Sequence, residues 1–184
     1  EVVGPVMALR PEGLPVWSFP TECPACGGRL ERKEGESDTF CINSRCPKQL
    51  EQRIVHFVGR SAMDIEHLGE RTIQLFIERG LLRDAADIYS LDWSRISELE
   101  GFGATSVQNL QTAIEDSKTR SLDRLLVGLG IRHLGNTGSK LLAQAFGHLD
   151  RLMDASSEEI AEVDGIGAVI AESVWAFMQE EENR

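Results

Sequence analysis

A five-residue pattern built around two glycines recurs along the chain, and it constrains the fold more than any other feature. The pattern is an apolar residue, a polar residue, glycine or histidine, an apolar residue and glycine, and it describes a tight turn leading into a helix. Its last glycine falls at Gly69, Gly103, Gly135 and Gly167, so successive copies lie 34, 32 and 32 positions apart. A nearly constant step of this length indicates a tandem repeat of one small structural unit.

The segments that follow the four copies are amphipathic and predict helices. Shorter helices are expected before the copies. Ser156, with Glu159 three positions later, has the spacing of a capping box, and Ser94 and Ser121 are further candidate N-caps. The unit is therefore helix, glycine hairpin, helix, and the predicted fold class is mainly α. The predicted helices after the hairpins span residues 70–79, 104–118, 136–146 and 168–179.

The same hairpins offer the chemistry of a phosphate-binding site. The first amides of a helix have no partner within the helix, and the helix dipole adds positive potential there, so an anion is stabilised at that end. Glycine leaves room for a phosphate to approach. Since nothing in this arrangement contacts a base edge, we expect binding to duplex DNA without sequence preference. The predicted DNA-binding residues are Arg60, Gly69, Gly101, Gly103, His133, Gly135, Gly165 and Gly167.

The four hairpins are not identical. His67 and His133 replace the first glycine in two copies, and these hairpins are either more structural or use their histidines to donate to phosphate. Gly101 and Gly103 are predicted to form the strongest phosphate contact. The alternative for all four copies is that the glycines only allow close packing of helices, as in a helical solenoid.

The chain contains four cysteines, arranged as two short-spaced pairs. Cys23 and Cys26 form a Cys-x2-Cys knuckle, and fourteen residues separate it from the second pair, Cys41 and Cys46. Two such pairs across a hairpin predict a tetrahedral zinc site with these four ligands. Four protein ligands leave no position for an activated water, so we expect a structural ion. Two disulfides or a redox Cys-x-x-Cys are the alternatives; an intracellular chain disfavours the first, and no thioredoxin-like pattern supports the second.

Charge and hydropathy bound the classes of function. The net charge of −11 argues against general attraction to nucleic acid, but residues 1–62 carry eight acidic and eight basic residues, whereas residues 150–184 carry ten acidic residues against two arginines. No apolar run approaches the ~20 residues of a membrane-spanning helix, and no basic and apolar leader opens the sequence. We therefore expect a soluble cytoplasmic protein that does not act at a membrane.

Composition divides the chain into three parts. Residues 1–20 are rich in proline and predict extended chain, either the last strand of an upstream domain or a flexible leader. Residues 21–47 hold the zinc module, and residues 48–184 hold the four repeats. A helix is predicted over residues 47–58, and Arg53, His56 and Arg60 near this junction could form a basic edge, although a packed histidine is the commoner case.

Together these features resemble the C-terminal half of bacterial NAD-dependent DNA ligases. The resemblance covers almost the whole chain and includes segments 19–27, 56–65 and 129–132 besides the four hairpins. It implies a four-cysteine zinc finger followed by a domain of four helix-hairpin-helix units. His67 stands where the family more often has glycine, which places the phosphate role of the first hairpin in doubt.

The resemblance also implies a function. The parent enzyme seals nicks between a 3′-hydroxyl and a 5′-phosphate in replication and repair, with NAD and magnesium as its cofactors. Residues 2–9 would be the last strand of an oligonucleotide-binding barrel, and the N-terminal ligase domains act in cis. No Lys-x-Asp-Gly adenylation motif occurs here, so no catalytic residue is assigned. The present part would clamp nicked double-stranded DNA in the bacterial cytoplasm, in association with the nucleoid.

Two other classes of function remain open. A DNA-binding module of an excision-repair nuclease would use the same hairpins but would not need the zinc module. A zinc-stabilised scaffold for protein interactions would fit the acidic charge better.

Overall fold

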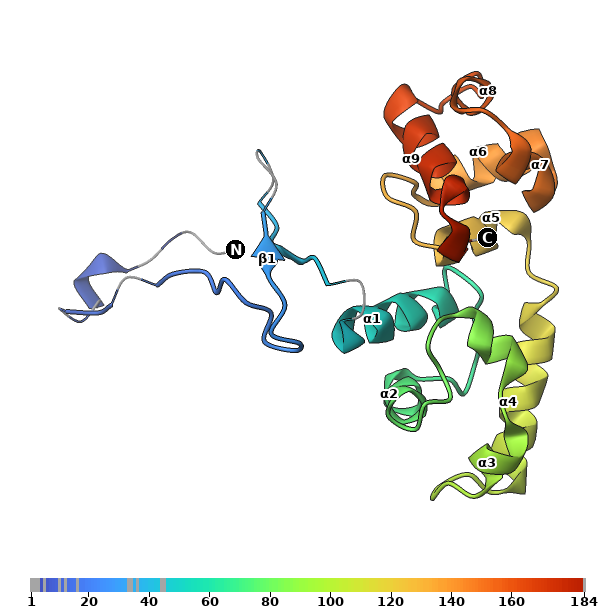
Figure 1. Ribbon diagram of the computed structural model, residues 1–184, viewed down its shortest axis with the longest axis horizontal. Coiled ribbons are helices and arrows are strands. Elements are labelled where there is room, and N and C mark those ends of the chain that lie inside the picture. The colour runs from blue at the N-terminus through green and yellow to red at the C-terminus, as the bar shows by residue number, and fades with distance from the viewer. Residues whose placement is uncertain are drawn as a thin grey trace. The chain divides into compact units, whose positions relative to one another are not determined.

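The computed structural model describes residues 4, 6–9, 11, 13–15, 17–32, 35, 37–43 and 46–183, and every structural statement below concerns these residues. The chain separates into two compact units, residues 1–46 and residues 47–184 (Figure 1). This boundary falls where the cysteine-rich segment gives way to the repeats. The predicted division at residue 20 stays a prediction.

The first unit is organised by a short antiparallel hairpin. Strand β1 (Leu30–Glu31) pairs with strand β2 (Phe40–Cys41), with Leu30 opposite Cys41. An isolated bridge joins Glu22 to Arg29 and extends the pairing toward the first cysteines. The hairpin therefore returns the second pair of cysteines to the side of the first pair.

The segment before the cysteines departs from the extended chain predicted for it. Met7–Leu9 form the 3-10 turn η1, so the prediction is wrong at these three residues. A strand needs a partner to complete its ladder of hydrogen bonds, and the described residues before Glu22 provide no paired strand. Val2 and Val3 lie outside the described residues, so the assignment of residues 2–9 to a barrel strand also stays a prediction.

The second unit is built from helices joined by short loops. The helix predicted over residues 47–58 is confirmed, and so are the four helices after the hairpins, two of which end one residue earlier than predicted. In chain order the helices are α1 (Pro47–Val58), α2 (Glu70–Glu78), η2 (Ala86–Ser90), α3 (Trp93–Ser97), α4 (Ala104–Ser117), α5 (Leu122–Gly128), α6 (Asn136–Phe146), α7 (Leu149–Asp154), α8 (Ser157–Ala161), α9 (Ala168–Gln179) and η3 (Glu181–Asn183).

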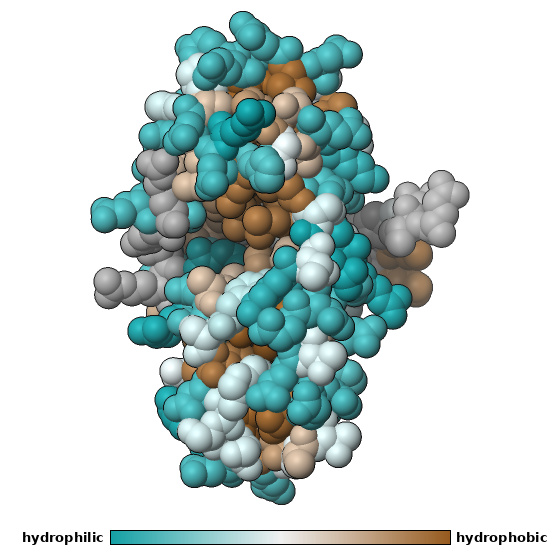
Figure 2. Space-filling view, turned by 90° about the vertical axis from the view of Figure 1, so that its right-hand side faces the viewer, coloured by the Kyte–Doolittle hydropathy of each residue, from teal (hydrophilic) through white to brown (hydrophobic). Residues whose placement is uncertain are grey.

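Two hydrophobic cores lie within this second unit. One is formed by buried side chains between Ile54 and Ile114, and the other by buried side chains between Leu126 and Met178. Figure 2 shows hydrophobic side chains in separate areas of the upper and lower halves of the view, with hydrophilic side chains around them. Since each core contains two hairpins, we call residues 47–117 the first tandem and residues 122–183 the second tandem.

Side-chain caps define the starts of two short helices. At α8 the predicted capping box is confirmed, because Ser156 Oγ accepts from the Glu159 amide at 3.2 Å and the Glu159 carboxylate accepts from the Ser156 amide at 2.8 Å. At α3 the predicted cap is wrong. Asp92, two residues before Ser94, is the N-cap, and its carboxylate accepts from the Ser94 amide at 3.1 Å and the Arg95 amide at 3.3 Å.

Ser121 occupies the N-cap position of α5, as predicted, but its side chain makes no capping hydrogen bond.

Among the described residues, none of the helices combines the length and apolar character that crossing a bilayer requires.

Candidate nucleic-acid interface and metal centre

The third residue of every hairpin adopts the same left-handed backbone conformation. The φ angle is +66° at His67 and at His133, +88° at Gly101 and +84° at Gly165. Residues other than glycine rarely adopt this conformation. Two histidines adopt it where the other copies have glycine, so the alternation of glycine and histidine does not alter the backbone of the hairpin.

The last glycine of each hairpin is the N-cap of the helix that follows. Gly69, Gly103, Gly135 and Gly167 have φ angles between −77° and −92° and extended ψ angles. Glycine has no side chain with which to cap a helix. The first amides of α2, α4, α6 and α9 therefore lack the side-chain cap that aspartate provides at α3 and serine provides at α8.

The protein itself does not require glycine at these four N-caps. Their φ angles suit any residue, and an added Cβ would meet no heavy atom within 4 Å. In contrast, a Cβ at Gly138 would lie 2.9 Å from Leu134 Cδ1, and a Cβ at Gly128 would lie 3.1 Å from Phe57 Cδ2. Close packing against neighbouring side chains thus explains Gly128 and Gly138 but not the N-cap glycines, which leave open space in front of unpaired amides.

An apolar side chain between the two special positions fastens each hairpin to its core. Leu68, Leu134 and Ile166 are buried, and Phe102 is half-buried with its ring centroid 5.4 Å from that of Phe76. In the last three copies the amide of this residue donates to the carbonyl three positions earlier, at 2.9–3.1 Å. The hairpin amides are therefore held in place before any ligand arrives.

The four hairpins differ in local charge. The first turn of α2 contains Glu70, whereas the first turns of α4, α6 and α9 contain no acidic residue. The polar residue of the pattern is acidic at Glu66, Glu100 and Asp164, and basic only at Arg132. Because a carboxylate repels phosphate, charge favours the third hairpin, whereas the sequence prediction favoured the second.

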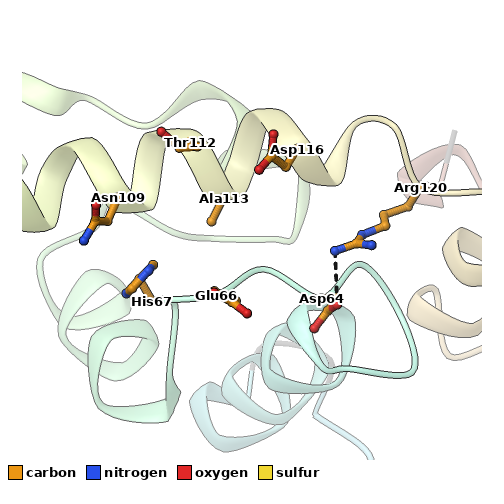
Figure 3. A pocket seen from close by; sticks show the side chains of 8 residues that line it. All are labelled: Asp64, Glu66, His67, Asn109, Thr112, Ala113, Asp116 and Arg120. Carbon is orange, nitrogen blue, oxygen red and sulfur yellow. Dashed lines mark hydrogen bonds and ion pairs between the residues drawn. The ribbon is translucent and has the colours of Figure 1, made fainter.

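A pocket of about 320 Å³ lies between the first hairpin and α4, and its lining is acidic. Figure 3 shows Asp64, Glu66 and His67 on one side and Asp116 of α4 on the other. Arg120 also lines the pocket, but its guanidinium pairs with Asp64 at 3.0 Å. These carboxylates disfavour phosphate, so the pocket does not belong to the candidate interface.

The predicted DNA-binding residues all lie at the surface, although they come from different loops rather than from one cleft. His56, considered as part of a basic edge, is instead used within the protein, since its Nε2 hydrogen-bonds to the Val127 carbonyl at 2.7 Å. The exposed residues are Arg60, Gly69, Gly101, Gly103, His133, Gly135, Gly165 and Gly167.

The four cysteine sulfurs form one cluster in the first unit. All lie within 4.8 Å of one another, with 4.0 Å between the Sγ atoms of Cys23 and Cys46 and 3.5 Å between those of Cys26 and Cys41. A tetrahedron with zinc–sulfur bonds of about 2.3 Å has edges of about 3.8 Å, so the cluster fits one zinc ion. The four cysteines are not joined in disulfides.

Two glycines shape the first cysteine knuckle. Gly27 has a φ angle of +68°, and the Gly28 amide donates to Cys26 Sγ at 3.4 Å. A Cβ at Gly28 would lie 3.0 Å from Asn43 Cβ and 3.1 Å from Cys26 Sγ. Gly28 is therefore part of the metal centre, and the Cys-Gly-Gly run was the sequence signal that could have identified it.

The surroundings of the sulfurs set their pKa values apart. Hydrogen bonds from the Asn43 side chain and then the Gly28 amide lower the pKa of Cys26 to about 6. The Asn43 amide also lowers the pKa of Cys41, but desolvation and hydrogen bonds to Cys26 and Cys23 outweigh it and raise this pKa to about 12. Four thiolates require a cation at this separation, and zinc bound by four cysteines is a structural ion with no open position for catalysis.

Three family models match parts of the chain. Residues 22–47 match the NAD-dependent DNA ligase C4 zinc finger domain, residues 60–116 match a SAM-like helix-hairpin-helix tandem, and residues 124–184 match a helix-hairpin-helix motif. These ranges correspond to the cysteine cluster, most of the first tandem and the second tandem.

Curated proteins named DNA ligase match the whole chain. The identity is 50% over 184 residues with a relative from Chloroflexus aurantiacus (strain ATCC 29366 / DSM 635 / J-10-fl), covering 100% of this chain and 26% of the relative. It is 44% over 182 residues with a relative from Macrococcus caseolyticus, covering 99% and 28%, and 43% over 184 residues with one from Rubrobacter xylanophilus, covering 100% and 27%.

The chain thus spans about a quarter of the length of the curated relatives that it matches. The cysteine cluster and the two tandems correspond in order to the matched zinc finger and helix-hairpin-helix domains. Over its whole length the chain is therefore similar to the part of these DNA ligases that contains the zinc finger and the helix-hairpin-helix domains, and its zinc finger matches the model of NAD-dependent DNA ligases.

Proposed function

We propose that this chain binds the sugar-phosphate backbone of duplex DNA through the amides of its hairpins, without reading base sequence. The observation that carries the proposal is the open space at Gly69, Gly103, Gly135 and Gly167, where neither backbone conformation nor packing requires glycine. An unpaired helix N-terminus stabilises an anion, and only a residue without a side chain lets the phosphate reach the amides. Uncharged donors also reconcile DNA binding with a net charge of −11.

Within a whole ligase this chain acts as the clamp on nicked duplex. The catalytic steps would belong to the rest of the enzyme, which would use NAD and magnesium as its cofactors. The zinc ion, held by Cys23, Cys26, Cys41 and Cys46, maintains the fold of the first unit and takes no part in the reaction. A bacterial ligase with this role works in the cytoplasm on the nucleoid.

The test is a titration of a nicked duplex at several salt concentrations with N-cap variants. Gly103→Asp and Gly135→Asp place a carboxylate that caps the helix and repels phosphate, so the helix is kept while the anion site is closed. We expect each variant to lose about tenfold or more in affinity, the size of one hydrogen bond to a charged group. The larger loss identifies the stronger hairpin, which charge predicts to be the third.

His148→Asp is the matched control, because it places a carboxylate at the N-cap of α7, which also lacks a side-chain cap but lies outside the hairpins. Its affinity should remain near that of the unaltered protein. Affinity must also fall as salt rises, since phosphate binding displaces counterions. Absence of binding at low salt would reject the proposal and leave the protein-interaction scaffold as the better function.

A second experiment separates a ligase clamp from the module of an excision-repair nuclease. The chain is added to, or fused with, a ligase fragment that retains the adenylation domain but lacks this region. Restored sealing of nicked duplex supports the ligase role. Tight binding to duplex with no restored sealing would support a different DNA enzyme.

A further inference from the structure

The two tandems meet where helix α5 lies against α1 and the segment that follows α1. Leu125 packs against the first core, whereas the adjacent Leu126 is buried in the second core. Helix α5, the first helix of the second tandem, therefore contacts both cores. The side chains around it determine how the two pairs of hairpins are held relative to each other.

Arg124 on α5 makes the most extensive of these contacts. Its Nε donates to the Ala62 carbonyl at 2.6 Å, and its Nη2 donates to the Arg60 carbonyl. Its Nη2 also lies 3.8 Å from the Asp64 carboxylate. One planar guanidinium thus reaches two carbonyls and one carboxylate of the first tandem, a geometry that lysine cannot reproduce.

Two neighbouring side chains reinforce this arrangement. Arg120, just before α5, donates to the Met63 carbonyl at 3.3 Å and to the Asp64 carboxylate at 3.0 Å, the pair marked in Figure 3. On the other side, His56 of α1 hydrogen-bonds to the Val127 carbonyl at 2.7 Å.

Packing closes the same junction. A Cβ at Gly128 would lie 3.1 Å from Phe57 Cδ2 and 3.3 Å from Ala62 Cβ, so α5 approaches the first tandem as closely as a glycine permits. We call Arg124, Arg120, Asp64, His56 and Gly128 the inter-tandem contact.

We propose that Arg124 is a positioning residue for DNA binding: through the inter-tandem contact it holds the two tandems as one rigid body, so that both pairs of hairpins meet the same duplex at once. This inference rests on the proposed function. If one tandem is bound, the other is then presented to the DNA at a high effective concentration, and this advantage falls when the joint becomes mobile.

The test compares Arg124→Met with the unaltered chain on duplexes of increasing length. Methionine keeps an unbranched apolar stem and removes every hydrogen bond of the guanidinium. We expect at least about a tenfold loss of affinity for a duplex long enough for both tandems, and little change for a duplex that accommodates one. The dependence of log K on log salt should keep its slope on the long duplex, since both tandems still reach it.

A slope reduced by about one would instead show that Arg124 contacts a phosphate directly, and this would overturn the proposal. Arg151→Met removes the same charge from an exposed position on α7 and serves as the control. Arg124→Lys keeps the positive charge but lacks the planar guanidinium with its several donors. Its affinity for the long duplex should therefore be as low as that of Arg124→Met. Recovery with lysine would also overturn the proposal.

Gly128→Ala opens the junction without changing charge and should reproduce the length-dependent loss. Hydrogen exchange without DNA gives an independent measurement: amides around residues 59–64 and 118–130 should exchange faster in Arg124→Met, while those of the two cores stay protected. Faster exchange together with unchanged affinity for long duplex would refute the positioning role. Absence of DNA binding by the unaltered chain would instead reject the proposed function. Hydrogen exchange would then still test whether Arg124 holds the two tandems rigidly together.

Discussion

At the scale of single residues, the hairpins separate two roles of glycine that look alike in the sequence. The third position has a left-handed φ angle in every copy, although His67 and His133 show that glycine is not essential there. The last position has an ordinary φ angle but open space in front of it, as at Gly135. The third position gives the hairpin its shape, and the last position leaves the amides accessible.

Replacing His133 by glycine tests whether its side chain contributes to binding. A non-glycine residue at a φ angle of +66° carries a conformational cost, so His133→Gly should leave stability unchanged or raise it by about 1 kcal/mol. If only the backbone binds phosphate, the affinity for duplex DNA should not fall. Thermal unfolding and a DNA titration measure both, and a clear loss of affinity would assign a phosphate contact to the imidazole.

Alanine substitutions within the fourth hairpin should separate the same two roles. Gly165 has a φ angle of +84°, and its added Cβ would lie 2.8 Å from Leu141 Cδ1, so Gly165→Ala should cost about 1–3 kcal/mol. Gly167→Ala meets no atom and should cost less than about 1 kcal/mol, the size of an N-cap effect. Denaturant unfolding gives both values. Equal losses would contradict the distinction between the two positions.

At the scale of elements, the sequence was informative where a signal was local. Helices α6 and α9 begin and end as predicted, because a glycine N-cap followed by apolar residues at helical spacing defines them. The start of α3 could not be chosen in the same way. Asp92 and Ser94 are both good N-cap residues two positions apart, and only the packing of Ile96, which is fully buried, decides where the helix begins.

The cap of α3 also predicts a pH dependence. Hydrogen bonds from the Ser94 side chain and then the Arg95 amide lower the pKa of Asp92 in the folded chain. The stabilisation is therefore present above the unfolded pKa of about 3.9 and is lost as pH falls through the lower folded value. Asp92→Asn removes the titration but keeps a capping side chain. The difference in free energy of unfolding between Asp92→Asn and the unaltered chain, measured by denaturant, should change between pH 5 and pH 2. A difference that stays constant over this range would contradict the assignment of the pKa shift to Asp92.

At the scale of the whole chain, two units with different sources of stability are joined at residues 46 and 47. The second has two hydrophobic cores, whereas the buried side chains among the described residues of the first are Cys23 and Cys46 of the cysteine cluster. A unit with so little buried apolar surface depends on its metal. The sequence could predict this division, because the cysteine spacing is local.

The contact between the two tandems could not have been predicted in that way. Arg124 and His56 bond to backbone carbonyls, which every residue carries, so no complementary residue type marks their partners. Gly128 does not indicate the contact in the sequence either, because glycine occurs at many positions for other reasons. Only the fold places these residues together.

Removal of zinc should affect the two units unequally. A strong chelator should eliminate the ordered hairpin of residues 21–46, while the helical circular dichroism and the thermal transition of residues 47–183 persist. Zinc added back should restore the hairpin, and NMR of the Gly28 and Cys41 amides would follow it. Loss of the helical signal on chelation would show that the second unit is not independently stable.

The N-cap glycines have one more consequence. A lysine side chain can be acylated, methylated or deprotonated, but a main-chain amide in a hairpin does not undergo these reactions. The sequence contains only four lysines, Lys33, Lys48, Lys118 and Lys140, and none of them belongs to a hairpin. DNA binding through main-chain amides should therefore be unaffected by lysine acetylation. It should also persist under alkaline conditions that would neutralise a DNA-binding surface made of lysines.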